Sequence, residues 1–318
     1  MGESAGSEVG AAPPRVSVVV PHYNDLPALD RCLALLVAQT YPRDRYDIIV
    51  ADNASPQGAD SVAAVVADNG SPQGVGAVGD LIGGRAKLVS VTERGAGPAR
   101  NGGVAACDGE ILAFTDSDCE AEPDWLARGV AALANHDFVG GRVKVLVPDP
   151  ARLTSTEAFE RVFAFDFKRY ITKKGFTGSG NLFCPRALFD AVGGFRVGVS
   201  EDVEWSHRAR AAGYTLGYAP LAVVGHPARR SWEELKRKWL RMNIEGYGLI
   251  RQQRAGRLKW LARNLLLPPS ALAHTPKVLF SPELDTFSQR LAALSMLYRL
   301  RLWRMADALK LLARPGDG

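Results

Sequence analysis

Acidic side chains gather directly after an apolar run in the string FTDSDCE. Asp116 and Asp118 are two positions apart, and alternate residues of an extended segment point the same way. Two carboxylates held this close repel each other unless a cation or a donor lies between them. A hard divalent ion that bridges phosphates meets that need. Taken alone, the string is equally compatible with a solvated turn before the helix expected after Pro123.

A second acidic pair, Glu201 and Asp202, follows Gly198, Val199 and Ser200. A carboxylate within hydrogen-bond reach of an attacking hydroxyl can take its proton, so the pair offers a general base. The alternative is structural, because acidic residues favour the first turn of a helix and Ser200 is a suitable N-cap.

The elements that must position these groups are short apolar runs alternating with helical patterns. Strands are expected at Val16–Val20, Tyr46–Asn53, Lys87–Thr92 and Glu110–Asp116, and helices near 26–40 and 97–109. Continuous apolar strands separated by helices predict an α/β fold with a mostly parallel sheet covered on both faces. Ligands of such sheets bind beyond the carboxyl ends of the strands, where both acidic strings and PHYND, after the first strand, are expected.

The composition of the 318 residues is that of a globular protein, with a net charge of +5. Four cysteines without C-x-x-C spacing predict neither disulfides nor a zinc site, which favours a reducing compartment. Residues 1–14 are interpreted as a flexible tail without a secretory signal. No run of apolar residues is long enough to predict a membrane-spanning helix.

The chain becomes basic and helical after the α/β part, over residues 231–318. From Arg229 to Arg263 there are eleven basic residues against three acidic ones, and a final helix is expected over 287–313. Such a helix is usually a solvated face, but leucine and tryptophan interleaved with arginine also suit an interfacial helix on anionic lipid. No nucleic-acid-binding motif accompanies the charge, so no nucleic-acid partner is expected.

One short internal repeat is present, because ADNASPQG at 51–58 recurs as ADNGSPQG at 67–74. It is too short for a repeat fold and is interpreted as a local loop expansion. Asp52 follows the better strand; with a different loop register, Asp68 would exchange roles with it.

Five strings in a fixed order carry a family resemblance. PHYND, ADNAS, GPARNGG, DSD and SEDVEWSHRARAAGY stand in the order and context of family-two glycosyltransferases, so the chain resembles that family from about Val16 to about Ser231. The resemblance implies a GT-A fold, the nucleotide-diphospho-sugar transferase fold, over 15–230. The helical region 231–318 would be an appendage to it.

The resemblance also implies residue roles. The implied donor-binding residues are Pro21, Tyr23, Asp52, Arg100, Asn101, Asp116, Ser179, Gly180 and Asn181. Mg²⁺ or Mn²⁺ would be held by Asp118 and His226, and Asp202 would be the catalytic base. Glu201 and Trp205 would face the acceptor.

For some of these residues a simpler interpretation remains open. Trp205 can equally be core, a lone histidine is more often structural, and the glycines of 178–183 can form a plain loop.

The implied function is inverting transfer of a sugar from a nucleotide-sugar donor, expected to be UDP-linked, to a hydroxyl of a glycan or lipid-linked glycan. The expected place is the cytoplasm, peripheral at the inner face of an anionic membrane. A dehydrogenase is disfavoured because no G-x-G-x-x-G follows the first strand. A sugar-phosphate nucleotidyltransferase and a non-catalytic membrane-surface protein on the same fold remain as alternatives.

Overall fold

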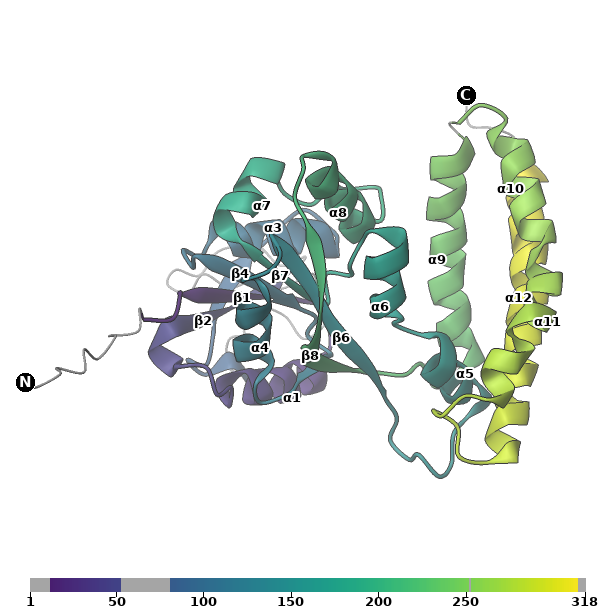
Figure 1. The fold of residues 1–318 in the computed structure, drawn as a ribbon, viewed down its shortest axis with the longest axis horizontal. Helices are drawn as coiled ribbons and strands as arrows, with labels where there is room; N and C mark the ends of the chain where they lie inside the picture. The colour runs from purple at the N-terminus through teal and green to yellow at the C-terminus, as the bar shows by residue number, and fades with distance from the viewer. Residues whose placement is uncertain (1–11, 53–80, 252, 314–318) are drawn as a thin grey trace, which may run out of the picture.

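The computed structural model describes residues 12–52, 81–251 and 253–313, and the described strands form one sheet beside a group of long helices (Figure 1). The strands are β1 (Val16–His22), β2 (Tyr46–Asp52), β3 (Lys87–Ser90), β4 (Ile111–Thr115), β5 (Glu120–Ala121), β6 (Phe138–Leu146), β7 (Asn181–Pro185) and β8 (Leu216–Pro227). Their order in the sheet is β3-β2-β1-β4-β7-β6-β8-β5. The second copy of the repeat, with Asp68, and most of the predicted tail lie outside the described residues.

The sheet is parallel in its first half and mixed in its second. β1 pairs in parallel with β2 and β4, and β2 pairs in parallel with β3. β7 runs antiparallel to both β4 and β6, whereas β6 and β8 are parallel again. The four predicted strands form the parallel half, and the nearly continuous burial of β1, β2 and β4 reflects a sheet covered on both faces.

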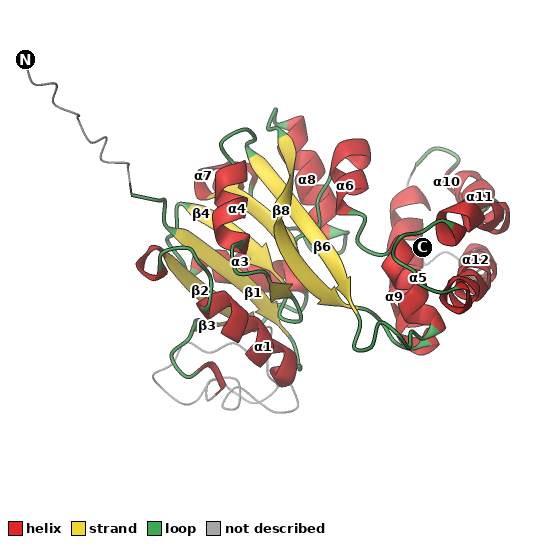
Figure 2. Cartoon of the chain, turned by 60° about the horizontal axis from the view of Figure 1, so that its bottom comes forward, coloured by secondary structure: helices red, strands yellow, loops and turns green. Residues whose placement is uncertain are grey.

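Helices cover both faces of the sheet (Figure 2). They are α1 (Leu26–Val37), α3 (Ala96–Ala105), α4 (Trp125–Ala132), α7 (Arg186–Val192) and α8 (Glu201–Ala211). Side chains of β1 alternate between the two layers: Val18 and Val20 pack with α1 and α4, whereas Val19 packs with α3, α7 and α8. The alternation fixes which residues at the end of each strand face the site.

The C-terminal helices stand beside the sheet and pack against one helix from within the α/β part (Figure 1). They are α9 (Trp232–Arg251), α10 (Gly256–Leu265), α11 (Leu267–Leu279) and α12 (Phe287–Ala313). The helix predicted over 287–313 is confirmed. α5 (Ser155–Phe163), which lies between β6 and β7 in the chain, buries its apolar face among them, and Thr154 starts it with a capping box.

A short connection links α5 to β7 and lies between the sheet and α9. It consists of α6 (Phe167–Arg169) and a π-helical turn, Tyr170–Lys174. Within the described residues, no helix is both long enough and apolar enough to span a bilayer.

Candidate functional site

The carboxyl ends of three neighbouring strands form the base of the site. His22 at the end of β1 lies opposite Asp52 at the end of β2, and both are buried. Pro21 pairs with the residue before Asp52, and Tyr23 is exposed just beyond the strand. The structure therefore brings Pro21, Tyr23 and Asp52 to one edge of the sheet, as parallel pairing requires.

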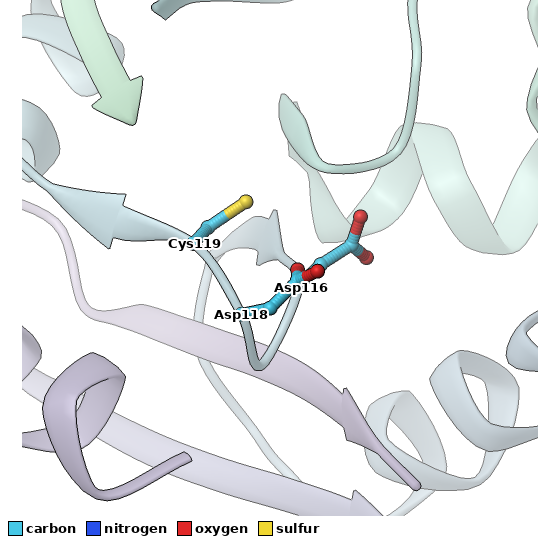
Figure 3. Close-up of side chains that lie close together, drawn as sticks. All are labelled: Asp116, Asp118 and Cys119. Atoms are coloured by element: carbon cyan, nitrogen blue, oxygen red, sulfur yellow. The ribbon is translucent and has the colours of Figure 1, made fainter. Parts of the chain in front are cut away.

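The acidic turn follows β4 at the same edge. The backbone N–H of Cys119 donates to the carbonyl of Asp116 at 3.0 Å and closes the turn. The turn brings three possible metal-binding atoms within 4.8 Å of one another: a carboxylate oxygen of Asp116, one of Asp118 and the sulfur of Cys119. Both carboxylates extend from the same side of the turn (Figure 3). Burial raises the pKa of the Cys119 thiol well above its usual value, so sulfur stays protonated and the carboxylates are the better ligands.

His226 faces the acidic turn from β8. The pairing of β5 with β8 brings the segment after Asp118 alongside Gly225, and the Nε2 atom of His226 lies 3.5 Å from Oδ2 of Asp118. Nδ1 lies 2.8 Å from the carbonyl oxygen of Pro227, to which it can donate, so Nε2 is the ring nitrogen that faces Asp118. Burial raises the pKa of Asp118, and His226 opposes this shift. The two carboxylates are ligands that suit Mg²⁺ or Mn²⁺, and the imidazole of His226 lies beside them.

Phe165 is a site neighbour that no pattern in the sequence predicted. Its ring lies 4.4 Å, centroid to centroid, from the ring of His226. Its backbone is left-handed, with φ of +54°, a conformation that costs energy for an aromatic residue. In the sequence this phenylalanine looks like any other apolar residue at the end of a helix.

Arg100 joins the acidic turn to the second acidic pair. Its side chain is buried on α3, and Nη2 donates to Oδ1 of Asp116 at 2.5 Å while Nη1 donates to Oε1 of Glu201 at 3.2 Å. Burial favours the neutral form, but Asp116, Glu201 and Asp202 outweigh it, so the pKa of Arg100 is raised. One guanidinium therefore fixes the distance between the turn and the start of α8.

Asp202 lies in the first turn of α8 and is poised to titrate near neutrality. Burial, followed by the charge of Glu201, raises its pKa from 3.8 to about 6, and Arg100 opposes the shift. Its Oδ1 accepts a hydrogen bond from the N–H of Val203 at 2.8 Å. Ser200 occupies the N-cap of α8 without a side-chain capping bond, and Glu201 and Asp202 lie in the first turn, where the helix dipole favours acidic residues.

The loop before β7 lies against the acidic turn. A Cβ on Gly180 would stand 2.7 Å from Oδ2 of Asp116, so only glycine leaves room for that carboxylate. Ser179 beside it is buried.

Asn181 has a different environment from the one predicted. Its amide donates to the carbonyls of Arg142 and Ala222 and accepts from Nε1 of Trp125, at 2.9 to 3.0 Å. The register of β6 against β8 shifts between Gly141 and Arg142, and the amide satisfies carbonyls that this irregularity frees. The side chain is fully buried, and its three bonds favour a structural role over contact with the donor.

Two further predicted residues make structural contacts. The amide of Asn101 donates to the carbonyl and accepts from the N–H of Phe195, both at 2.8 Å. Trp205 is fully buried between aromatic rings of the core, and its indole N–H donates to Gly193. A buried ring cannot stack on a sugar, so of the two interpretations of Trp205 the core one is correct.

Comparisons of the sequence with a family profile and with known proteins all point to the same family. The sequence profile described as "Glycosyl transferase family 2" matches residues 17–201. The chain is 33% identical to Glycosyltransferase AglE of Haloferax volcanii over 230 residues, 71% of each protein. It is 26% identical to Probable glycosyltransferase YdaM of Bacillus subtilis over 72% of this chain and 55% of that protein.

Solved structures resemble the fold. Mannosyltransferase PcManGT from Pyrobaculum calidifontis, solved with GDP-Man and Mn²⁺, matches with a TM-score of 0.52 at 23% identity, over 97% of this chain and 77% of that one. GalNAc-T7, solved with UDP, GalNAc and Mn²⁺, matches with a TM-score of 0.50 at 20% identity, over 69% and 45%.

These matches favour neither the nucleotidyltransferase nor the non-catalytic alternative. The predicted GT-A fold is confirmed, with a more mixed sheet than the strand pattern indicated. The chain belongs to glycosyl transferase family 2, and it is a glycosyltransferase with the GT-A fold.

Proposed function

We propose that the protein transfers a sugar, with inversion, from a nucleotide-sugar donor to a hydroxyl of a glycan or lipid-linked glycan. One observation carries the proposal: Arg100 bonds both Asp116 and Glu201, which supports a single site for the acidic turn and Asp202, the residue that we propose as the base. The Mn²⁺ and nucleotide ligands of the two structural neighbours support the donor class. A uridine nucleotide is the donor we expect, with Asp52 beside its base or ribose.

The metal would be held by Asp118 and His226, whose atoms Oδ2 and Nε2 already face each other. The carboxylate oxygens of Asp118 suit both Mg²⁺ and Mn²⁺. A bound divalent cation would supply positive charge to the departing diphosphate. Gly180 and Arg100 keep the carboxylate of Asp116 in place beside it.

Asp202 would take the proton from the acceptor hydroxyl. Its raised pKa, about 6, lets it be ionised at neutral pH and still hold a proton well enough to act as a base. Glu201 remains on Arg100 and keeps the first turn of α8 in position. Attack from the side opposite the leaving group inverts the anomeric centre.

Replacing Asp202 by asparagine tests the proposal. Asp202→Asn is expected to lower kcat by about 10²- to 10⁴-fold while nucleotide-sugar binding, measured by calorimetry with Mn²⁺, is retained. Asp190→Asn, an equal change at an exposed position of α7, is the control. Unchanged turnover in Asp202→Asn would remove this residue from the reaction.

We further propose that α10 and α11 rest on an anionic membrane surface. Four apolar residues at helical spacing on and just beyond α11 are exposed: Pro269, Leu272, Pro276 and Phe280. The opposite side of that helix, with Ala271 and Val278, is buried. Exposed basic residues precede the stripe without an acidic residue among them: Arg254, Arg257, Lys259 and Arg263. Apolar residues beside such charge suit an interfacial helix.

Vesicle sedimentation tests this surface. The protein is expected to bind vesicles that contain phosphatidylglycerol more strongly than vesicles of phosphatidylcholine alone, and Leu272→Glu with Phe280→Glu should weaken binding by about tenfold or more. Leu221→Glu, at an equally exposed leucine of β8, is the control. Equal binding of all three proteins would rule the surface out.

A further inference from the structure

A cavity of about 180 Å³ lies between the α5–α6 segment and the C-terminal helices, apart from the acidic turn. Its walls come from α5, α6, the π-helical turn, α9, α11 and α12. None of the residues at the acidic turn or in the first turn of α8 lines it.

Positive charge dominates the cavity walls. The cationic lining residues are Arg169, Lys174, Lys238, Lys277 and Arg301, whereas the acidic ones are Glu160 and Asp166. Glu160 is already shared, since it bonds Arg229 as well as Lys238, and Asp166 lies 3.9 Å from Lys277. The acids therefore leave a surplus of uncompensated cations.

Two buried N–H groups of the lining are hydrogen-bond donors without a partner in the described part of the chain. Nε of Arg301 and Nε1 of Trp239 are buried and have no hydrogen-bond acceptor among the described residues. Burial lowers the pKa of Arg301, and no nearby acid counters the shift. Buried donors and cations are normally satisfied, so this arrangement favours a ligand rich in acceptor oxygens.

The remaining wall is apolar and aromatic. Phe159, Phe163 and Leu300 line the cavity beside the cations. A carrier with hydrocarbon next to its anionic group would contact both kinds of wall.

Phe165 links the wall of the cavity to the proposed metal site. Ala164 and Asp166 line it, and Phe165 between them packs against the ring of His226. The ammonium group of Lys238 lies 5.4 Å from the centre of that same Phe165 ring.

We propose that this cavity binds a phosphate group through Arg301, Lys238 and Lys277, at a site separate from the donor diphosphate. Phosphate offers several acceptor oxygens and the negative charge that the lining lacks. The carrier is either a phosphate-bearing amphiphile, which also fits the apolar wall, or free phosphate. If the carrier is the acceptor, its position behind Phe165 would bring its sugar toward the metal site; that part rests on the proposed function.

Calorimetry on the full chain, without nucleotide and without divalent cation, tests the site directly. Inorganic phosphate and decyl phosphate are the two probes. Arg301→Gln, and separately Lys277→Gln at the exposed rim, should each weaken binding by about tenfold or more. Lys310→Gln, an exposed lysine on the same helix as Arg301, should bind like the parent.

The outcomes distinguish an amphiphile from free phosphate, and they distinguish failure of the phosphate site from failure of the proposed transfer function. Tighter binding of decyl phosphate assigns the site to an amphiphile, and equal binding assigns it to free phosphate; both support the site. Binding of neither probe, or parental affinity in both Arg301→Gln and Lys277→Gln, overturns it. Asp202→Asn should still bind the probes, so loss of transfer and loss of this site can be told apart.

Discussion

Gly180 lies so close to Asp116 that a methyl group on residue 180 would stand 2.7 Å from the Oδ2 atom of that carboxylate. Gly180→Ala must therefore displace Asp116, which Arg100 holds from the other side. A displacement of about 1 Å in an active site can cost about a hundredfold in rate, and we expect a loss of this order in kcat/KM.

The matched control for this change is Gly248→Ala on α9. A Cβ there meets nothing within 4 Å, so activity should be unchanged and stability slightly higher. A Gly180→Ala enzyme with parental kcat/KM would show that the position of Asp116 does not matter for transfer.

The pKa of Asp202 predicts both the pH profile and a stability change. A base must be ionised, so kcat/KM should fall as pH drops below about 6. The folded protein holds this proton more tightly than the unfolded chain, whose carboxyl keeps a pKa near 3.8. Tighter proton binding by folded Asp202 therefore stabilises the fold. This stabilisation is fully present below about pH 4 and is lost as pH rises through 6.

Asp202→Asn should therefore be inactive yet more stable than the parent at pH 8. The difference in melting temperature should shrink between pH 6 and pH 4, where the parental carboxyl becomes neutral. Thermal unfolding at several pH values measures it. A variant that is less stable at pH 8 would contradict the unfavourable burial of the Asp202 charge.

His226 should control the affinity for Mn²⁺, because its Nε2 faces Asp118. His226→Ala is expected to weaken Mn²⁺ binding by about 10- to 100-fold, as measured by the spin-resonance signal of the free ion. His136→Ala, at an exposed histidine, is the control. Equal Mn²⁺ affinity in both variants would exclude His226 from the metal site.

Asn181 should matter for stability and not for donor affinity. Asn181→Ala removes the partner of the Trp125 indole and of two carbonyls, so we expect a loss of about 3 kcal/mol in the free energy of unfolding. Denaturant titration measures this loss, with exposed Asn135→Ala as the control. A higher KM for the donor without any loss of stability would restore the role that the sequence predicted.

Much of the fold could be predicted because its signals are local. Continuous apolar runs mark β1, β2, β3 and β4, and the final helix follows from its own spacing. The antiparallel β7 could not be placed in this way, because strand direction depends on the path that the chain takes through α5 and α6.

The site divides along the same line. Asp116 and Asp118 belong to a short acidic string directly after a strand, and Asp202 belongs to one at the start of a helix. Sequence patterns can therefore identify these residues. The roles of Asn181 and Trp205 depend on which groups surround them, and Phe165 carries no pattern at all. Partners distant in sequence decide whether a polar or aromatic residue is structural or functional.

Because α5 packs among the C-terminal helices, the smallest active form of the protein is expected to include these helices. A chain cut before α9 would uncover Ala158, Phe159 and Val162, the residues of α5 that these helices cover. α5 ends two residues before Phe165, so the neighbour of His226 would lose its anchor as well. Metal binding beside His226 is therefore expected to depend on the C-terminal helices that cover α5.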